Sequence, residues 1–397
     1  MSRLSNRTYQ IAPSKTVEIS NIAMELKQKG IDIISFSAGE PDFDTPAFIK
    51  DAACLAIKAG ITKYTPVRGL TPLIEAIRDK LKRDNSLAFT HDQIIVTTGA
   101  KQAIALALDA IVDGGDEVII PAPYWVSYPD MVKLSGGIPV IVDTSHENGY
   151  KVTPDMLDQV ITKDTKAVIL NSPTNPTGAV YSKEEVAGLS SVCIKHKIYI
   201  ISDEIYEHII FDESHHSIAR SSDNAKKLTI LVNGCSKAYA MTGWRVGYAA
   251  AEADIIGAMA KIMSQRTTNA CSISQMAAVA ALNGDHKVVD TMVAEYRERR
   301  DYMVEGLNGL DIACTSPQAT FYVFPDIAPL LKKRYKQEVI KTANRFCTLL
   351  LKEAKVAAVP GEPFGNPTNI RLSFATSRNC IEEGLKRIKD FLSELDG

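Results

Sequence analysis

IYIISDEIY at residues 198–206 and LTILVNGCSKAYAMTGWR at 228–245 set the architecture of this chain. Each begins with a run of apolar, mostly β-branched residues, which is typical of a strand buried on both faces of a sheet. Asp203 ends the first run, and Lys237 follows the second. Ligands of open α/β sheets bind at the carboxyl ends of the strands, so we expect these two side chains to meet at a site.

Similar runs lie on either side of this pair. Between about residues 94 and 250, short β-branched runs alternate with longer amphipathic stretches, a pattern that predicts a sheet covered by helices on both faces. The other runs are IIVT, EVIIPA, IPVIV, AVILN and VGYAAA, and the clearest helical stretches are KQAIALALDAIV and SKEEVAGLSSVCIKH. The expected fold class is α/β, with a large three-layer α/β/α domain around a mostly parallel sheet.

The pattern changes after residue 285. Apolar residues recur at helical intervals over 286–307, which predicts one long amphipathic helix that leads out of the large domain. Beyond it lie short strand candidates (FYVF, VAAVP, NIRLSFA) and two helix candidates (VIKTANRFCTLLLKEA, IEEGLKRIKDFLSEL). We therefore predict a large domain at 45–290 and a small α+β domain formed by 1–44 and 291–397.

Composition excludes several classes of protein. The 397 residues carry a net charge of −2, and the basic residues form no stripe, so nucleic acid is not an expected partner. The chain shows no secretory leader at its start and no stretch of roughly 18 apolar residues, so we expect a cytoplasmic protein without a membrane partner. Its seven cysteines form no CxxC pair, and no metal site is expected. His215 and His216, in DESHHS, are interpreted as part of an exposed loop.

An acid and a lysine at neighbouring strand ends are the two groups that pyridoxal phosphate chemistry requires. The lysine binds the cofactor aldehyde covalently, and the acid keeps the pyridine nitrogen protonated. Taken singly, a lysine is usually a solvated charge and a strand-end Asp is usually a turn residue. The assignment of Lys237 and Asp203 to this cofactor therefore depends on the residues around them.

Two further polar residues are expected at the cofactor ring. The motif NSPTNPTG at 171–178 follows an apolar run, and its prolines favour an extended loop that projects Asn175. Tyr206 lies three residues past Asp203, so one helical turn would place both on the same side. Either residue could belong to an ordinary loop or strand end, but together they can donate to the ring oxygen.

A third group of residues suits a phosphate. In TTGAKQAIALAL, Gly99, Ala100 and Lys101 begin an apolar helix, where free backbone amides and the helix dipole attract an anion. Ser236 and Arg245 flank Lys237 and offer a hydroxyl and a guanidinium. Taken singly, Ser236 is more commonly a helix cap and Arg245 a surface charge, but the combination indicates a phosphate site.

With these motifs the chain resembles the class I pyridoxal-phosphate-dependent aminotransferases of the aspartate aminotransferase group, which have fold type I. The resemblance runs nearly end to end. It includes SAGEPDFDTP (37–46), KYTPVRG (63–69), TTGAKQA (97–103), PAPYWVSYP (121–129), NSPTNPTGAVY (171–181), SDEIYEHIIF (202–211), SKAYAMTGWRVGY (236–248) and NIRLSFA (369–375).

The resemblance assigns roles that agree with those argued from the residues. It implies that Lys237 binds the cofactor and acts as the catalytic base, that Asp203 pairs with the ring nitrogen, and that Asn175 and Tyr206 contact the ring oxygen. It further implies that Trp125 stacks on the ring.

The resemblance also implies substrate contacts and a partner. Arg371 would grip the substrate α-carboxylate, assisted by the backbone of Gly39. Tyr64 would reach the phosphate of a neighbouring subunit, which implies a homodimer with shared active sites.

One departure from the best-known branch concerns the substrate side chain. Where that branch has hydroxyl residues, this chain has Gly99, Ala100 and Lys101, resembling a second branch whose lysine helps to hold a distal carboxylate. Lys15 and Thr16, in PSKTVEIS, lie in a segment that the family folds over the site and are further candidates for this contact.

The expected function is transfer of the amino group of L-aspartate to 2-oxoglutarate through a PLP/PMP ping-pong cycle. Preference for prephenate, aromatic substrates or alanine remains an alternative, as does a pyridoxal-phosphate-dependent β-lyase. A regulator that binds the cofactor without turnover is disfavoured, because the chemical residues are present and no basic recognition helix is found.

Overall fold

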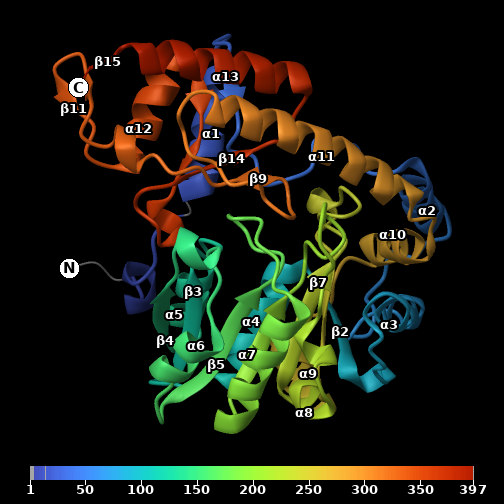
Figure 1. The fold of residues 1–397 in the computed structure, drawn as a ribbon. Coiled ribbons are helices and arrows are strands. Elements are labelled where there is room, and N and C mark those ends of the chain that lie inside the picture. The colour runs from blue at the N-terminus through green and yellow to red at the C-terminus, as the bar shows by residue number, and fades with distance from the viewer. Residues whose placement is uncertain (1–3, 14, 397) are drawn as a thin grey trace.

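The computed structural model describes residues 4–13 and 15–396. Its centre is a seven-stranded sheet in the order β2-β8-β7-β6-β5-β3-β4 (Figure 1). All neighbouring strands are parallel except β8, which is antiparallel to both β2 and β7. The strands are β2 Ile94–Thr97, β3 Glu117–Ala122, β4 Ile138–Asp143, β5 Thr165–Asn171, β6 Tyr199–Asp203, β7 Thr229–Gly234 and β8 Gly247–Ala250. Each corresponds to one of the apolar runs in the sequence, which confirms the predicted α/β fold.

Helices cover both faces of this sheet, because successive strand residues point to opposite sides. In β5, Ile169 packs in a cluster with α4 and α9, whereas Val168 packs in another with α7. The helices over the sheet are α4 Ala100–Ile111, α5 Tyr128–Leu134, α6 Pro154–Val160, α7 Lys183–His196, α8 Asp223–Leu228 and α9 Ala253–Arg266. Three more pack together near β2: α2 Ala47–Lys58, α3 Thr71–Asn85 and α10 Ser272–Asn283.

The helix predicted at 286–307 is α11, Lys287–Asn308, which runs along the upper part of the molecule in Figure 1. Around it, within the described residues, lie three small sheets and three helices. Their elements are α1 Lys15–Gln28, β1 Ile34–Ser35, β9 Tyr322–Val323, β10 Arg334–Tyr335, β11 Glu338–Val339, α12 Ala343–Leu349, β12 Val356–Ala357, β13 Val359–Pro360, β14 Ile370–Ser373, α13 Arg378–Ser393 and β15 Leu395–Asp396. The domain boundaries at 44/45 and 290/291 remain a prediction.

The amino-terminal segment packs against the carboxyl-terminal part of the chain, since β1 pairs with β12 in parallel. One predicted helix is shorter than expected. In VIKTANRFCTLLLKEA, Val339 belongs to β11, and Thr342 caps the helix by accepting a hydrogen bond from the backbone of Arg345. The end of this stretch, Leu350–Ala354, is a π-helical turn.

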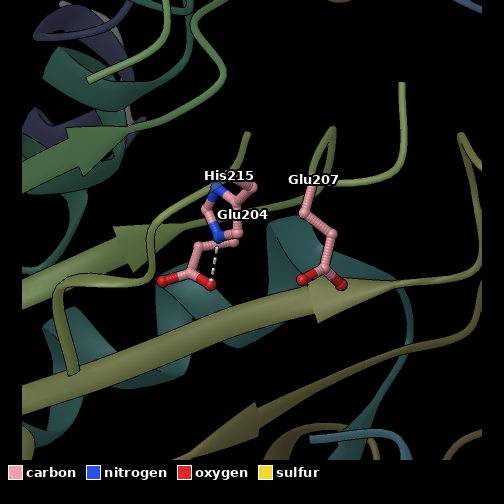
Figure 2. Close-up of side chains that lie close together, drawn as sticks. All are labelled: Glu204, Glu207 and His215. Atoms are coloured by element: carbon pink, nitrogen blue, oxygen red, sulfur yellow. Dashed lines mark hydrogen bonds and ion pairs between the residues drawn. The ribbon is translucent and has the colours of Figure 1, made fainter. Parts of the chain in front are cut away.

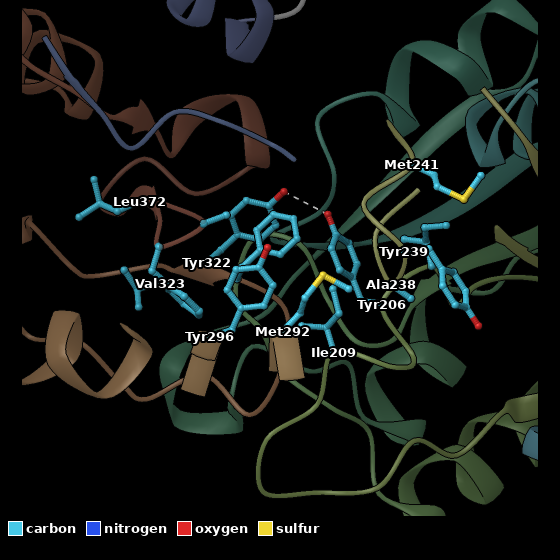
Figure 3. Packing of buried hydrophobic residues seen from close by; sticks show 14 of the residues in the cluster. Tyr206, Ile209, Ala238, Tyr239, Met241, Met292, Tyr296, Tyr322, Val323 and Leu372 are labelled. Carbon is cyan, nitrogen blue, oxygen red and sulfur yellow. Dashed lines mark hydrogen bonds between the residues drawn. The ribbon is translucent and has the colours of Figure 1, made fainter. Parts of the chain in front are cut away.

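The large sheet and the elements around α11 share a hydrophobic core near the carboxyl ends of the large sheet. Figure 3 shows Tyr206, which follows β6, beside Tyr322 of β9 and Tyr296 of α11. The hydroxyls of Tyr206 and Tyr322 are 3.1 Å apart, and their ring centroids are 6.0 Å apart. Aromatic packing therefore joins the large sheet to the small one at the place where the motifs converge.

No helix in the described part of the chain has both the length and the apolar content that crossing a bilayer would require.

Candidate functional site

A cavity of about 390 Å³ opens at the carboxyl ends of β5, β6 and β7. This volume is within the range of small-molecule sites. Most of the sequence-predicted site residues line it, from segments that are far apart in the chain. They are Thr16, Gly39, Ala100, Lys101, Trp125, Asn175, Asp203, Tyr206, Ser236, Lys237, Arg245 and Arg371.

Asp203, the last residue of β6, is buried at the floor of the cavity. The hydroxyl of Tyr128 donates a 2.7 Å hydrogen bond to its Oδ2, and the backbone N–H of Ile205 donates to Oδ1 at 3.3 Å. Burial raises the pKa of Asp203 to about 6, although both hydrogen bonds oppose this shift. A carboxyl group in this position can share a proton with a basic nitrogen near neutral pH.

Lys237 follows β7 and faces the same cavity. Its Nζ donates a 2.6 Å hydrogen bond to the backbone oxygen of Gly39 and lies 6.0 Å from the centroid of the Tyr206 ring. Burial lowers the pKa of Lys237 to about 8, with Glu40 opposing the change. About one tenth of this amine is therefore neutral, and nucleophilic, at pH 7.

Arg371 lies in β14 and is only 2% exposed, yet no carboxylate among the described residues forms an ion pair with it. Its Nη1 donates to Oδ1 of Asn175 at 3.1 Å, and its Nη2 donates to the backbone oxygen of Ser37 at 3.2 Å. Its Nε is buried without a partner, and burial lowers the pKa of the guanidinium. A buried cation is costly without an anion, so this geometry suits a bound carboxylate.

The loop after β5 holds Asn175 in place. The side-chain oxygen of Asn171 accepts from the backbone N–H of Asn175 at 2.9 Å, and its amide donates to the backbone oxygen of Asp203 at 2.9 Å. Since the Asn175 oxygen accepts from Arg371, its amide nitrogen is the group left to donate into the cavity.

The first turn of α4 forms the opposite wall. Gly99 precedes this helix with a φ of 81°, a conformation that favours glycine. A Cβ at Gly99 would lie 2.7 Å from Nη2 of Arg245, so the guanidinium packs directly over the helix start. Arg245 is held by a 2.9 Å hydrogen bond from its Nη1 to the backbone oxygen of Thr242. The helix amino terminus and this guanidinium together suit a phosphate.

Lys101 is a second cation at the cavity. Its Nζ lies 4.8 Å from the centroid of the Trp125 ring, and that ring packs edge-to-face on Tyr128. Burial and the nearby Arg245 lower the pKa of Lys101. No carboxylate of the described residues pairs with it, which leaves it available to an anionic ligand.

Three predicted site residues do not line this cavity. Gly99 lies just behind it, under Arg245. Lys15 lines a separate hollow between α1 and α12 and pairs with Glu18 at 2.9 Å, so the structure does not bring it to the site. Tyr64 is 88% exposed on the surface.

Several lining residues were not identified from the sequence. Tyr128, Ser37 and Ser20 form hydrogen bonds at the cavity, and Glu40 accepts a 2.6 Å hydrogen bond from Thr242. Tyr128 lies three positions after Trp125 in PYWVSYP, a spacing that could have suggested a shared direction. The serines carry no comparable signal.

His215 lies in a loop, as expected, but the expectation that it is exposed is wrong. Its side chain is 9% exposed, and its Nε2 lies 2.9 Å from Oε2 of Glu204, with Glu207 beside the pair (Figure 2). These three residues have the donor atoms of a metal site. Lys80, however, forms a buried ion pair with Glu207, and the hydroxyls of Ser202 and Ser217 donate to Oε1 of Glu204 at 2.8 and 2.7 Å, so both carboxylates already have partners.

Comparisons with known proteins found relatives that match nearly the whole chain. A family model described as aminotransferase class I and II matches residues 31–388. The chain is 45% identical over 394 residues to an aspartate aminotransferase of Bacillus subtilis (strain 168), with 99% of each chain covered. It is 46% identical over 396 residues to an aspartate/prephenate aminotransferase of Nitrosomonas europaea, covering 98% of this chain and 100% of the other.

Solved structures are similar over the same span. A crystal structure of the aspartate aminotransferase from Rhizobium meliloti has a TM-score of 0.96 at 42% identity and covers 100% of both chains. The aspartate aminotransferase from Thermus thermophilus with maleate has a TM-score of 0.94 at 42% identity, covering 98% of this chain and 100% of the other.

Proposed function

Because the chain belongs to the class I and II aminotransferases, which are pyridoxal-phosphate-dependent enzymes, we propose that it moves the amino group of L-aspartate to 2-oxoglutarate. The products are oxaloacetate and L-glutamate. The two half-reactions form a PLP/PMP ping-pong cycle, in which aspartate gives its amino group before 2-oxoglutarate takes it.

The residues at the cavity fit the cofactor. Lys237 would bind its aldehyde, Asp203 would face the ring nitrogen, and the start of α4 with Arg245 would hold the phosphate. When bound, pyridoxal phosphate draws electrons from the substrate Cα into its protonated ring. Asn175 and Tyr206 would donate to the ring oxygen, and Trp125 would stack on the ring.

Lys237 is the proposed catalytic base. With the cofactor and the amino substrate bound, the neutral Nζ of Lys237 would remove the α-proton of the substrate and would later give a proton back. Its lowered pKa, about 8, supports this role because the neutral amine is accessible near neutral pH. Arg371 would orient the substrate so that the C–H bond can break perpendicular to the ring.

The observation that carries the choice of an acidic substrate is a pair of cations that face one cavity without acidic partners. Arg371 would bind the α-carboxylate and Lys101 the distal carboxylate. The Thermus relative was solved with maleate, a dicarboxylate of four carbons like aspartate. Thr16, which lines the cavity from α1, would lie near the distal group.

Prephenate is the second candidate substrate. Relatives at 46% identity are named aspartate/prephenate aminotransferases, and prephenate also carries two carboxylates. The same pair of cations would therefore serve both substrates. A panel of acceptors with aspartate as donor would separate the two activities.

The direct test of the proposed function combines labelling with kinetics. Borohydride reduction of the loaded enzyme and peptide mapping should place the cofactor on Lys237, and Lys237→Ala should abolish transamination while the fold is retained. Lys227→Ala, an exposed lysine of α8, is the matched control. A label on another residue, or full turnover by Lys237→Ala, would contradict the assignment.

Product analysis separates transfer from β-elimination. A transaminase requires a 2-oxo acid acceptor and shows parallel lines in double-reciprocal plots. A β-lyase would release ammonia and pyruvate from a cysteine conjugate without an acceptor.

A homodimer with shared sites is the proposed assembly. Tyr64 is 88% exposed and lies away from the cavity of its own subunit, as a residue that completes a partner's site would. Lys237→Ala and Tyr64→Ala chains expressed together should regain activity, because one hybrid site would contain both native residues. If mixed dimers stay inactive, Tyr64 does not act across the interface.

A further inference from the structure

Tyr128, the first residue of α5, makes a direct contact with the acid at the floor of the cavity. Its side chain is 2% exposed, and its hydroxyl donates to Oδ2 of Asp203 at 2.7 Å. The function proposed above assigns it no role. A buried hydroxyl that points at a functional carboxylate is well placed to control the state of that carboxylate.

The phenol has little freedom to move. Its ring packs edge-to-face on Trp125, with centroids 5.4 Å apart and an interplanar angle of 81°. The backbone N–H of Tyr128 donates to the backbone oxygen of Trp125 at 3.0 Å. The residue that would stack on the cofactor ring thus also fixes the side chain that binds Asp203.

Asp203 is constrained on its other side as well. Its Oδ1 accepts from the backbone N–H of Ile205, and its backbone oxygen accepts from the amide of Asn171 at 2.9 Å. The contacts to Tyr128 and Ile205 use two of the roughly four acceptor positions of the carboxylate, and because Asp203 lines the cavity a donor bound there can use another.

We propose that Tyr128 is a positioning residue, which keeps Asp203 ionised and aimed so that the shared proton stays on the cofactor ring nitrogen. This inference rests on the proposed role of Asp203 as the partner of that nitrogen.

The electrostatics of the site show why such a donor is needed. Burial raises the pKa of Asp203 to about 6, and the adjacent Glu204 adds to the rise. Lys237 acts in the opposite direction, as do the hydrogen bonds from Tyr128 and Ile205. Tyr206 also lies near Asp203, and burial raises its pKa too. Without Tyr128, the carboxyl would compete more strongly with the ring nitrogen for the proton.

Tyr128 itself remains a donor throughout. Burial and the neighbouring Asp203 carboxylate raise its pKa well above the ordinary tyrosine value. It therefore keeps its proton over the working pH range and gives Asp203 a constant hydrogen bond.

The test uses a ligand that cannot react with Lys237. The purified full chain, stripped of cofactor, is titrated with 4′-deoxypyridoxine 5′-phosphate, and tryptophan fluorescence reports the dissociation constant from pH 4.5 to 8.5. In the complex, one proton is shared between the ring nitrogen and Asp203. Below the pKa of Asp203 in the empty site, the carboxyl group already carries a proton. Binding of the protonated ligand must then release one of the two protons, so the affinity falls about tenfold per pH unit.

Tyr128→Phe keeps the ring and removes only the hydroxyl. Loss of a hydrogen bond to a charged group should raise the pKa of Asp203 by about one unit. The pH at which affinity begins to fall should therefore move upward by about one unit. Ligand phosphate titration contributes equally in every variant, so it cancels from the difference.

Tyr181→Phe is the matched control, since Tyr181 is also buried and its hydroxyl accepts a 3.0 Å hydrogen bond from the backbone of Val152. Tyr181→Phe should lower the melting temperature without changing the pH at which the affinity for the ligand begins to fall. Fluorotyrosine at position 128, a stronger donor that retains the packing, should move this pH downward and covers the case in which Tyr128→Phe fails to fold.

The outcomes are distinguishable. The role of Tyr128 would be supported if phenylalanine and fluorotyrosine at position 128 move the pH at which affinity begins to fall in opposite directions, while Tyr181→Phe leaves that pH unchanged. An unchanged pH in both variants at position 128, with normal ligand binding, would overturn it and leave the proposed function standing. Failure of the wild-type chain to bind the ligand would overturn both.

Discussion

Arg371 and Asn175, 196 positions apart in the sequence, are joined by a hydrogen bond of 3.1 Å from Nη1 to Oδ1. Arg371 comes from β14 of the small antiparallel sheet, and Asn175 comes from the loop after β5 of the large sheet. The bond connects the proposed carboxylate site to the proposed ring-oxygen donor. Binding of a substrate to Arg371 therefore bears directly on the orientation of Asn175.

Replacing Arg371 tests this arrangement. Arg371→Lys keeps the charge but loses the two-pronged geometry, so kcat/KM for aspartate should fall by about 100-fold, corresponding to about 3 kcal/mol. Steady-state kinetics with each substrate provide the measurement. Arg378→Lys, which changes an arginine stacked on Tyr302, is the control. Wild-type kcat/KM in Arg371→Lys would rule out the carboxylate contact.

Lys101 should govern the preference for acidic side chains. Lys101→Ala removes the cation proposed for the distal carboxylate, so KM for aspartate should rise at least tenfold while turnover of alanine or phenylalanine is unchanged or improved. Lys82→Ala, on the exposed side of α3, should change neither the KM for aspartate nor the turnover of alanine or phenylalanine. An equal loss with all donors would instead place Lys101 at the phosphate.

The reactivity of Lys237 should depend on pH in a defined range. Burial lowers its pKa to about 8, and Glu40 opposes that shift. The rate at which the cofactor-free chain forms its bond with pyridoxal phosphate should therefore rise between pH 7 and 9, as the amine loses its proton. Stopped-flow absorbance measures this rate.

Glu40→Gln should move the half-maximum of that profile to lower pH, because it removes the nearby carboxylate that favours the charged amine. Glu298→Gln, on the exposed surface of α11, should not move it. A midpoint near the ordinary lysine value of 10.5 would mean that Lys237 is solvated in solution.

The free energy of unfolding should depend on the buried ion pair between Lys80 and Glu207. Lys80 contacts Glu207, and both side chains are almost fully buried. Burial alone would raise the pKa of Glu207, but the Lys80 ammonium lowers it well below the ordinary 4.5. Lys80→Met should cost about 3–5 kcal/mol, because it leaves an uncompensated buried charge. Urea unfolding at pH 7 measures this loss.

Two controls make this prediction specific. Lys195→Met breaks an exposed pair with Asp158 and should cost less than about 1 kcal/mol. Since the pKa of Glu207 is depressed by folding, its contribution is present at neutral pH and declines as pH falls below 4.5. Equal stability of Lys80→Met and Lys195→Met would contradict the assignment of a buried pair.

Much of the fold followed from local patterns in the chain. The apolar runs around Asp203 and Lys237 predicted the strands of the large sheet, and the spacing over 286–307 predicted α11. Strand and helix periodicities act between near neighbours, so they are readable without knowledge of packing. The helix expected from Val339 was shortened because β11 pairs with β10, a contact that periodicity does not encode.

The amino-acid sequence by itself determined which chemical groups stand at the strand ends: an acid, a lysine, an amide loop and a glycine that begins a helix. Only the tertiary structure decided which of them converge. It placed Thr16 at the cavity and Lys15 away from it, buried His215 against Glu204, and brought Tyr128 to Asp203. These relationships depend on burial and on hydrogen bonds between distant segments, and such contacts arise only when the whole chain is packed.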